Sequence, residues 1–231
     1  MAHLLQDYEG EFMPFCQLMK SENVRSYLEI GSFSGGSIEV AAKYLPIGSR
    51  IVSVDLPWKQ TKQVRLASTL DDLKRHGYDT HLIIGNSTDG ESIAKARKYG
   101  PYDAVFIDGD HTFEGVLADV LAHWNVLQSA GEKPALAAFH DALPNDNFKW
   151  RDSGRRWKRF WIRFKNNFRK QKKPEIGPAY EPGILKVCDE LIRQGLAVKW
   201  KSAASMLVLR KLADLPQNFS EIVRQALAHG S

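Results

Sequence analysis

The sequence has no long apolar run, few cysteines and no basic leader, and each absence excludes a class of protein. No apolar run approaches the roughly 20 residues that a membrane-spanning helix needs. The amino terminus carries Asp7, Glu9 and Glu11 in place of a basic start followed by an apolar stretch, so no signal peptide is expected. Cys16 and Cys188 are far apart and have no metal-ligand spacing. We therefore expect two buried thiols in a cytoplasmic protein.

The length and composition are those of an ordinary globular chain. The 231 residues are 43% hydrophobic and 26% charged, which predicts one sizeable core and a single domain over residues 1–231. The apolar spacing of residues 1–25 predicts a helical cover at the amino terminus, interrupted near Pro14. Residues 213–231 are expected to end the chain in a surface helix.

The net charge of +5 is unevenly distributed. Residues 149–173 hold twelve Lys and Arg against one acid, Asp152, so this run carries +11 and the rest of the chain −6. The basicity is thus a property of one segment and does not indicate a nucleic-acid binder along the whole chain.

Residues 27–55 have the pattern of a strand, a glycine-rich turn, a helix and a second strand, which is a βαβ unit. Gly31, Gly35 and Gly36 would let the backbone approach a ligand closely, and the helix that follows offers unpaired N–H groups. Asp55 ends the second strand, where a carboxylate can accept hydrogen bonds from both hydroxyls of a ribose. The segment predicts a nucleoside-containing cofactor; the alternative is an ordinary turn with no ligand.

The order of residues in the turn distinguishes between cofactors. A dinucleotide fold has the pattern G-x-G-x-x-G, whereas this chain places Glu29 two residues before Gly31 and opens the helix with Ser37. A carboxylate would repel a pyrophosphate but suits the cationic end of a cofactor that carries an amino acid. At these residues the sequence resembles the class I S-adenosylmethionine-dependent methyltransferases.

The rest of the chain continues the alternation of strands and helices. Helices are expected at 60–75, 89–99, 112–127 and 183–193, and strands at 80–85, 102–108, 135–139, 196–201 and 205–212. The last two strands are separated by a short turn and must be antiparallel. The fold class is therefore α/β: a Rossmann-like, seven-stranded methyltransferase sheet, mostly parallel with a C-terminal antiparallel hairpin and with helices on both faces.

Polar residues follow the third strand, where ligands of open α/β sheets bind. The resemblance implies that Asn86 and Ser87 hold the adenine amino group; a purely capping role is the alternative. Thr88 and Glu91 have capping-box spacing, so the next helix is expected to begin at Asp89.

A second polar group follows the fourth and fifth strands. Asp108, Asp110 and His111 come after one, and His140 and Asp141 after the other, so parallel pairing would bring them into one cleft. Such oxygen-rich ligands suit Mg²⁺ or Mn²⁺, and the absence of cysteine disfavours structural zinc. A histidine, with a pKa of about 6.5, can take the proton of an attacking hydroxyl near neutral pH.

The segments 106–119 (FIDGDHTFEGVLAD) and 138–141 (AFHD) are similar to the small-molecule O-methyltransferase branch, which includes antibiotic- and macrolide-sugar-tailoring enzymes. The resemblance extends over about 24–141, and loosely over 182–212. The cofactor contacts expected on these grounds are Glu29, Gly31, Ser32, Phe33, Gly35, Ser37, Asp55, Leu56, Asn86, Ser87, Asp108, Gly109 and His111.

In metal-dependent members of that branch, the residues at the places of Asp108, His140 and Asp141 hold Mg²⁺, and the residue at the place of His111 is the base. The resemblance thus implies Asp108, His111 and Asp141 as catalytic and Asp108, His140 and Asp141 as metal ligands. His140 stands where an acid is common. The structural alternatives are that Asp108 touches the cofactor or caps a helix, that His111 is a satisfied histidine, and that His140 and Asp141 form a local pair.

The insertion at residues 142–181 contains the basic run and an aromatic stripe at helical spacing, formed by Trp157, Phe160, Trp161, Phe164 and Phe168. Such a basic amphipathic helix could be a lid over an acceptor pocket, a contact with an anionic membrane at the inner face, a nucleic-acid contact, or a surface that packs on the domain or on a second subunit.

Together these features predict an S-adenosylmethionine-dependent O-methyltransferase that acts on a hydroxyl of a small molecule or glycan, with Mg²⁺ or Mn²⁺ assistance. The alternatives are an RNA methyltransferase that uses the basic run and a non-catalytic module that only binds the cofactor.

Overall fold

The computed structural model describes residues 8–57, 60–128, 134–142, 183–203 and 205–229. All of these belong to one compact unit of the chain, residues 1–143 with 182–231. The predicted insertion at 142–181, with its basic aromatic helix, lies outside the described residues except for Ala142.

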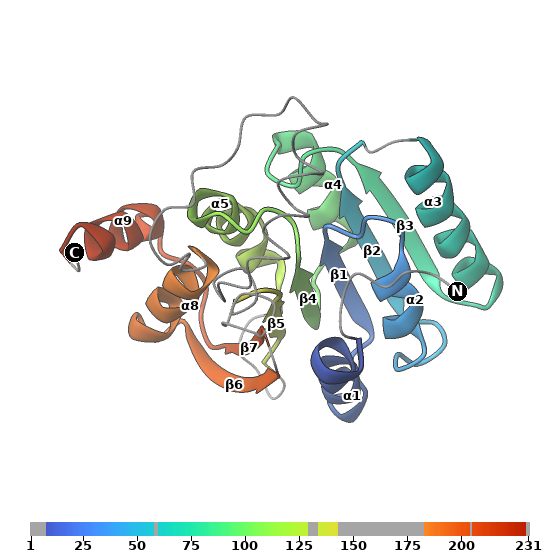
Figure 1. The fold of residues 1–231 in the computed structure, drawn as a ribbon, viewed down its shortest axis with the longest axis horizontal. Coiled ribbons are helices and arrows are strands. Elements are labelled where there is room, and N and C mark those ends of the chain that lie inside the picture. The colour runs from blue at the N-terminus through green and yellow to red at the C-terminus, as the bar shows by residue number, and fades with distance from the viewer. Residues whose placement is uncertain (1–7, 58–59, 129–133, 143–182, 204, 230–231) are drawn as a thin grey trace, which may run out of the picture. The chain divides into compact units, whose positions relative to one another are not determined.

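The described residues contain one mixed β-sheet whose strand order is β3-β2-β1-β4-β5-β7-β6 (Figure 1). Strands β1 to β5 run parallel, while β7 pairs antiparallel with both β5 and β6. The prediction of a mostly parallel seven-stranded sheet with a terminal hairpin is confirmed. The strands are β1 (Ser26–Ile30), β2 (Arg50–Asp55), β3 (Asp79–Ile84), β4 (Ala104–Ile107), β5 (Leu136–Phe139), β6 (Ala197–Ala203) and β7 (Met206–Lys211).

Helices cover both faces of the sheet, as predicted. The helical elements are η1 (Tyr8–Phe12, a π-helix), α1 (Met13–Ser21), α2 (Gly36–Ala42), α3 (Gln60–Arg75), α4 (Gly90–Tyr99), α5 (Phe113–His123), η2 (Trp124–Val126, a 3₁₀ turn), α8 (Gly183–Arg193) and α9 (Phe219–His229). Helices α1, α2 and α3 share one apolar core, and α4, α5, α8 and α9 share the other.

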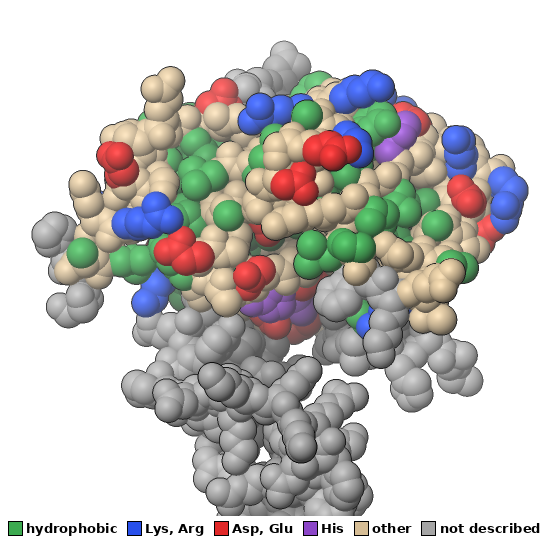
Figure 2. All heavy atoms as spheres, turned by 90° about the horizontal axis from the view of Figure 1, so that it is seen from above, with side chains coloured by type: hydrophobic (Ala, Val, Ile, Leu, Met, Phe, Trp, Pro, Cys, Tyr) green, Lys and Arg blue, Asp and Glu red, His purple; other side chains and the backbone are tan. Residues whose placement is uncertain are grey.

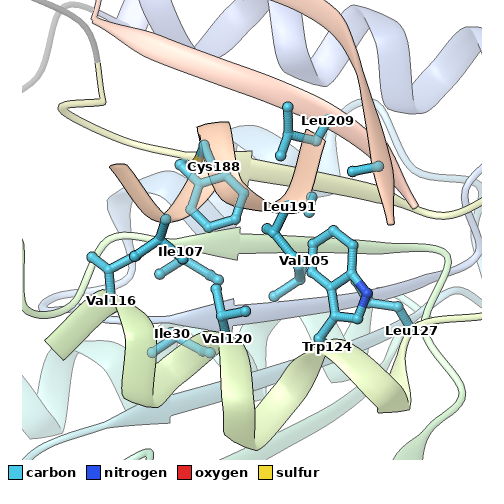
Figure 3. Packing of buried hydrophobic residues seen from close by; sticks show 14 of the residues in the cluster. Ile30, Val105, Ile107, Val116, Val120, Trp124, Leu127, Cys188, Leu191 and Leu209 are labelled. Atoms are coloured by element: carbon cyan, nitrogen blue, oxygen red, sulfur yellow. The ribbon is translucent and has the colours of Figure 1, made fainter. Parts of the chain in front are cut away.

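The strands contribute side chains to both cores because successive side chains point to opposite faces of the sheet. On β1, Leu28 and Ile30 enter the core beneath α5 and α8, while Tyr27 enters the core beneath α1 and α2. Figure 3 shows the first of these cores, where Trp124 and Cys188 lie among aliphatic side chains. Cys16 and Cys188 are both buried free thiols, as predicted.

The predicted boundaries need three corrections. The amino-terminal helix changes from π to α at Met13, and Pro14 sits in the first turn of α1, where its missing N–H costs nothing. Helix α5 ends at His123 and continues as a 3₁₀ turn. The capping box at Thr88 is wrong, because Asp89 is the residue whose side chain accepts from the Ser92 N–H.

No helix in the described part of the chain is long and apolar enough to cross a membrane. The carboxyl ends of the parallel strands β1 to β5 all lie at one edge of the sheet. Every site residue predicted from the sequence follows one of these five strands or lies in its last residues.

Candidate functional site

The glycine-rich turn after β1 lies directly against the end of β4. Gly31 has a φ of +88°, and a β-carbon at this position would come within 2.3 Å of the carbonyl oxygen of Asp108. Gly35 has a φ of +83° and is the residue from which helix α2 starts. Phe33 also has a positive φ, and the Lys62 ammonium lies 3.4 Å from its ring centroid. The turn therefore approaches the carboxyl ends of the strands with backbone that carries no side chain at Gly31.

Glu29, on β1 two residues before Gly31, is fully buried. Its two carboxylate oxygens accept hydrogen bonds from the Tyr27 hydroxyl at 2.6 Å and from the Ser37 hydroxyl at 2.5 Å. Burial raises the pKa of Glu29 to about 7, because these hydrogen bonds offset only part of the cost of desolvating the charge. A carboxylate held in this way suits a ligand that brings a positive charge.

The second strand ends at Asp55, which is buried, and is followed by Leu56, of which 48% is exposed. Ser32 in the glycine-rich turn accepts a hydrogen bond of 2.7 Å from Ser53 on β2. The structure thus brings the predicted ribose-binding carboxylate and the predicted turn residues to adjacent strand ends.

The loop after β3 is held by residues that the sequence analysis did not identify. Ser87 donates a hydrogen bond of 2.6 Å to Asp119, and the ring of His123 contacts the Ser87 carbonyl at 2.8 Å. Both partners are buried residues of α5. The Asn86 side-chain oxygen accepts from the N–H and hydroxyl of Thr88, while the cap of helix α4 is Asp89. The sequence signal for Asp119 is an acid between the apolar residues 116–118 and 120–122.

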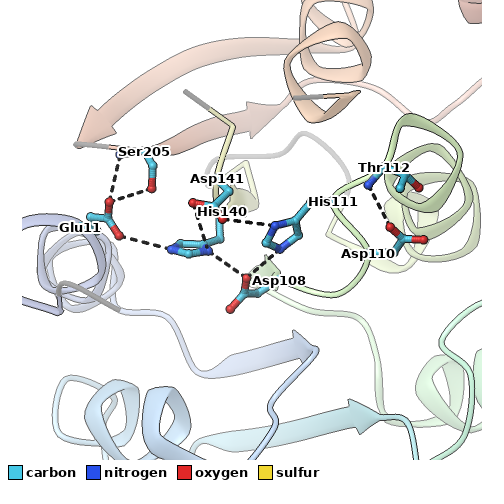
Figure 4. A network of polar contacts seen from close by, with 8 residues as sticks. All are labelled: Glu11, Asp108, Asp110, His111, Thr112, His140, Asp141 and Ser205. Carbon is cyan, nitrogen blue, oxygen red and sulfur yellow. Dashed lines mark hydrogen bonds and ion pairs between the residues drawn. The ribbon is translucent and has the colours of Figure 1, made fainter. Parts of the chain in front are cut away.

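The predicted cluster after β4 and β5 is assembled in the structure (Figure 4). The two ring nitrogens of His111 lie 3.1 Å from Asp108 and 3.2 Å from Asp141. Asp108 also lies 2.9 Å from Nδ1 of His140. In Figure 2, histidine and acidic side chains lie next to one another in the lower middle of the coloured surface. Of the His111 side chain, 28% is exposed.

The cluster is a network of opposite charges. Hydrogen bonds with Asp108 and Asp141 raise the pKa of His111 to about 10. Burial lowers the pKa of His140, but contact with Asp108 outweighs burial and raises it to about 9. Burial opposes ionisation of Asp108 and Asp141, yet the two imidazoles outweigh it and lower both carboxyl pKa values. The cluster on its own therefore holds its protons on the histidines.

The donor atoms also fit a metal ion. Asp108, His111 and His140 each offer one ligand atom, and these atoms all lie within 4.8 Å of one another. Of the three ligands predicted from the sequence, Asp108 and His140 are in this group, whereas Asp141 is not, although its carboxylate lies 3.9 Å from Nδ1 of His140. His140 is 8% exposed, and its Nδ1 lies 2.9 Å from the Asp108 carboxylate. A buried imidazole nitrogen and a carboxylate oxygen this close together are donor atoms that one cation could share.

Glu11 is a further member of the cluster that the sequence analysis missed. It reaches His140 from the π-helix η1, with 3.3 Å between its carboxylate and Nε2 of the ring. Its other oxygen accepts from the hydroxyl of Ser205 at 2.7 Å. No local pattern marks Glu11, because these partners are separated from it by more than a hundred residues.

Most residues of this site lie within a segment that is similar to a known protein family. Residues 28–142, which include the turn, the loop after β3 and the Asp/His cluster, match a family model described as a methyltransferase domain. This part of the chain is a methyltransferase domain. No curated protein matches the chain.

Solved structures support the same fold. The cofactor-bound Rv0187 from MTB has a TM-score of 0.60 at 13% identity, over 93% of this chain and 84% of that one. The O-methyltransferase TomG from Streptomyces achromogenes, in complex with SAM, has a TM-score of 0.56 at 15% identity, over 91% and 82%. MycE methyltransferase from the mycinamycin pathway, in complex with Mg and SAH, has a TM-score of 0.52 at 19% identity, over 94% of this chain and 53% of MycE. At these identities the likeness establishes the fold.

In this methyltransferase the predicted cofactor residues line adjacent strand ends. Glu29 and the glycines follow or end β1, Asp55 ends β2, and Asn86 follows β3. The individual contacts of these residues with the cofactor remain predictions.

Proposed function

We propose that this methyltransferase transfers the methyl group of S-adenosylmethionine to a hydroxyl oxygen of a small molecule or glycan. One observation carries the proposal: the backbone of Gly31 lies directly against the backbone of Asp108. The glycine-rich turn and the Asp/His cluster are therefore neighbours. A methyl donor held by the turn would then lie beside groups able to take a proton.

The cofactor would lie along the carboxyl edge of β1, β2 and β3. Glu29 would face its amino group, and Asp55 would accept from its ribose hydroxyls. Asn86 and Ser87 would border the adenine. Solved neighbours that contain SAM or SAH support this placement.

The reaction breaks the bond between sulfur and the methyl carbon and forms a bond from that carbon to the acceptor oxygen. Sulfur keeps the electron pair and becomes neutral, while the hydroxyl proton must leave to a base. His111 is the imidazole nearest the surface in the cluster, since 28% of its side chain is exposed against 11% for His140. We assign it the role of base.

A divalent cation would be held by Asp108, His140 and Asp141. When bound it would lower the pKa of the acceptor hydroxyl and neutralise the carboxylates that keep a proton on His111. This would free His111 to accept the proton of the acceptor. The Mg in the MycE complexes supports a metal in such a fold, and the MycE complex with mycinamycin VI supports a small-molecule acceptor.

The test begins with calorimetry of S-adenosylhomocysteine binding, followed by assays of methyl transfer to a panel of phenolic and sugar hydroxyls. His111→Ala should lower kcat by about 10²–10⁴-fold and leave cofactor affinity within a few-fold. EDTA should lower the rate, and Mg²⁺ or Mn²⁺ should restore it. Absence of binding by well-folded protein would refute the proposal.

The alternative acceptor is RNA, favoured by the +11 charge of residues 149–173, whose structure is not described. Methyl incorporation into RNA, with none into the hydroxyl panel, would establish it. The same segment motivates an anionic membrane surface or a second subunit as partner. Co-sedimentation with anionic vesicles and light scattering would separate those two.

A further inference from the structure

Glu11 is a buried acid that contacts two residues far along the chain, His140 and Ser205. It is 6% exposed, and its carboxylate bridges His140 at 3.3 Å and Ser205 at 2.7 Å. The Ser205 N–H lies 3.3 Å from the same oxygen as the Ser205 hydroxyl. A buried carboxylate requires such partners, and His140 is the only ring among these.

The neighbouring packing makes the contact rigid. Phe12, the residue after Glu11, packs on Phe106 of β4 with 4.9 Å between ring centroids. Phe106 in turn meets the His140 ring edge-on at 6.2 Å. Glu11 and His140 are therefore fixed relative to each other by fully buried aromatic rings. The π-helical turn η1 directs Glu11 into this position.

The contact has a consequence for the other ring nitrogen. When Nε2 of His140 donates its proton to Glu11, the neutral ring presents the lone pair of Nδ1. That nitrogen lies 2.9 Å from Asp108 and 3.9 Å from Asp141, inside the cluster. Figure 4 shows Glu11 on one side of the ring and the two aspartates on the other.

We propose that Glu11 is a positioning residue that makes His140 a nitrogen ligand, so that the centre takes a transition-metal dication such as Mn²⁺, Co²⁺ or Zn²⁺ in preference to Mg²⁺. Imidazole nitrogen suits these ions, whereas Mg²⁺ favours an all-oxygen octahedral set. The inference rests on the divalent site of the proposed function. It goes beyond it by naming the metal class and the residue that sets it.

The test titrates the metal-free, full-length protein with Co²⁺, followed by visible absorption, and with Mn²⁺ and Mg²⁺ by calorimetry. Wild-type protein should bind Co²⁺ and Mn²⁺ at least tenfold more tightly than Mg²⁺. Glu11→Gln keeps the side-chain volume but removes the charge behind the ring, and should weaken Co²⁺ binding about 10–100-fold. Its effect on Mg²⁺ should be smaller.

Two further variants sharpen the result. His140→Glu replaces nitrogen with oxygen and should strengthen Mg²⁺ binding while it removes the preference for Co²⁺. Glu22→Gln makes the same chemical change near the amino terminus, on an acid that pairs with Arg210 and is remote from the cluster contacts. Its metal affinities should equal those of wild type. Circular dichroism and thermal melts verify that each variant is folded.

Equal affinity for Mg²⁺ and Co²⁺, or an unchanged Co²⁺ affinity in folded Glu11→Gln, would overturn the inference. Calorimetry with S-adenosylhomocysteine on the same samples keeps it separate from the proposed function. If the cofactor binds and methyl transfer proceeds while no metal binds, the inference fails and the proposed function stands. If the cofactor does not bind, the proposed function fails, and the metal titration still decides the inference.

Discussion

Ser37, in the first turn of helix α2, donates a hydrogen bond of 2.5 Å to the fully buried carboxylate of Glu29 on β1. The Tyr27 hydroxyl donates to the other oxygen, so the acid is anchored from two elements. Even so, burial is the larger effect and raises the pKa of Glu29 to about 7. The strand that leads into the glycine-rich turn therefore carries a carboxyl group whose pKa lies near neutral pH.

This gives a prediction for the pH dependence of stability without cofactor. The Glu29 pKa is higher in the folded state, about 7, than the ordinary value of 4.5, so folding favours the protonated form. The contribution of Glu29 to the free energy of unfolding is thus complete below about pH 4.5 and is lost as the pH rises through about 7. The loss should be about 3 kcal/mol.

Urea unfolding of wild type and Glu29→Gln between pH 4.5 and 8 would measure it. The glutamine side chain of the variant does not titrate, so the difference between the two proteins isolates the carboxyl from all other groups. Parallel pH profiles for the two proteins would contradict the prediction. Saturating S-adenosylhomocysteine, whose amino group is cationic, should flatten the wild-type profile because it favours the carboxylate.

Gly31→Ala should abolish cofactor binding or weaken it at least tenfold. The added methyl group would strike the Asp108 carbonyl, and the φ of +88° is unfavourable for alanine. The free energy of unfolding should fall by about 3 kcal/mol or more. Calorimetry with S-adenosylhomocysteine and urea unfolding are the measurements.

Gly48→Ala is the matched control, because Gly48 has nearly the same φ, +84°, and no atom within 4 Å of the added β-carbon. Gly48→Ala should lower the free energy of unfolding by about 1 kcal/mol and leave the affinity for the cofactor unchanged. If both variants lost the same stability and both bound the cofactor normally, close approach of the turn to Asp108 would not be what requires glycine at position 31.

Much of the fold could be predicted because local patterns and tertiary structure agree. Helices 60–75 and 183–193 appear with the predicted ends, since their apolar spacing and flanking breaks coincide. The end of α5 was harder to predict. Trp124 continues the apolar pattern, but its indole N–H donates to the Ala213 carbonyl from far along the chain, beside a 3₁₀ turn.

The candidate site was predictable only where it follows strand ends. Asp108, His111, His140 and Asp141 were found because parallel strands bring their carboxyl ends together. Glu11 could not be found, because its contact with His140 spans 129 positions and depends on the packing of η1. No periodic pattern encodes such a contact.

The cap of helix α4 is testable directly. Asp89 accepts from the Ser92 N–H at 2.8 Å, whereas Thr88 hydrogen-bonds only to Asn86 among the contacts described. Asp89→Ala should lower the free energy of unfolding, because a helix-terminal N–H loses its acceptor. Thr88→Ala should cost clearly less in the same urea titration. The reverse order would restore Thr88 as the cap.

The loop after β3 should depend on the pair formed by Ser87 and Asp119. Asp119 is 2% exposed, and burial raises its pKa to about 6, with the Ser87 hydroxyl donating the hydrogen bond that opposes this. Without the Ser87 hydroxyl, the buried carboxylate of Asp119 loses a hydrogen-bond donor. Ser87→Ala should therefore lower the free energy of unfolding by about 1–3 kcal/mol at pH 7. S-adenosylhomocysteine affinity should fall as well, because the loop is expected to border the adenine.

A double-mutant cycle distinguishes this pair from two independent effects. Once Asp119 is replaced by alanine, the Ser87 hydroxyl has lost its acceptor, so Ser87→Ala should then cost little and the coupling should be about 1–3 kcal/mol. Asp119→Asn still offers an oxygen to Ser87 without a charge, and should retain most of the cofactor affinity that Asp119→Ala loses. Additive costs in urea unfolding, or equal cofactor affinity for the Asn and Ala variants, would show that Asp119 acts through packing alone.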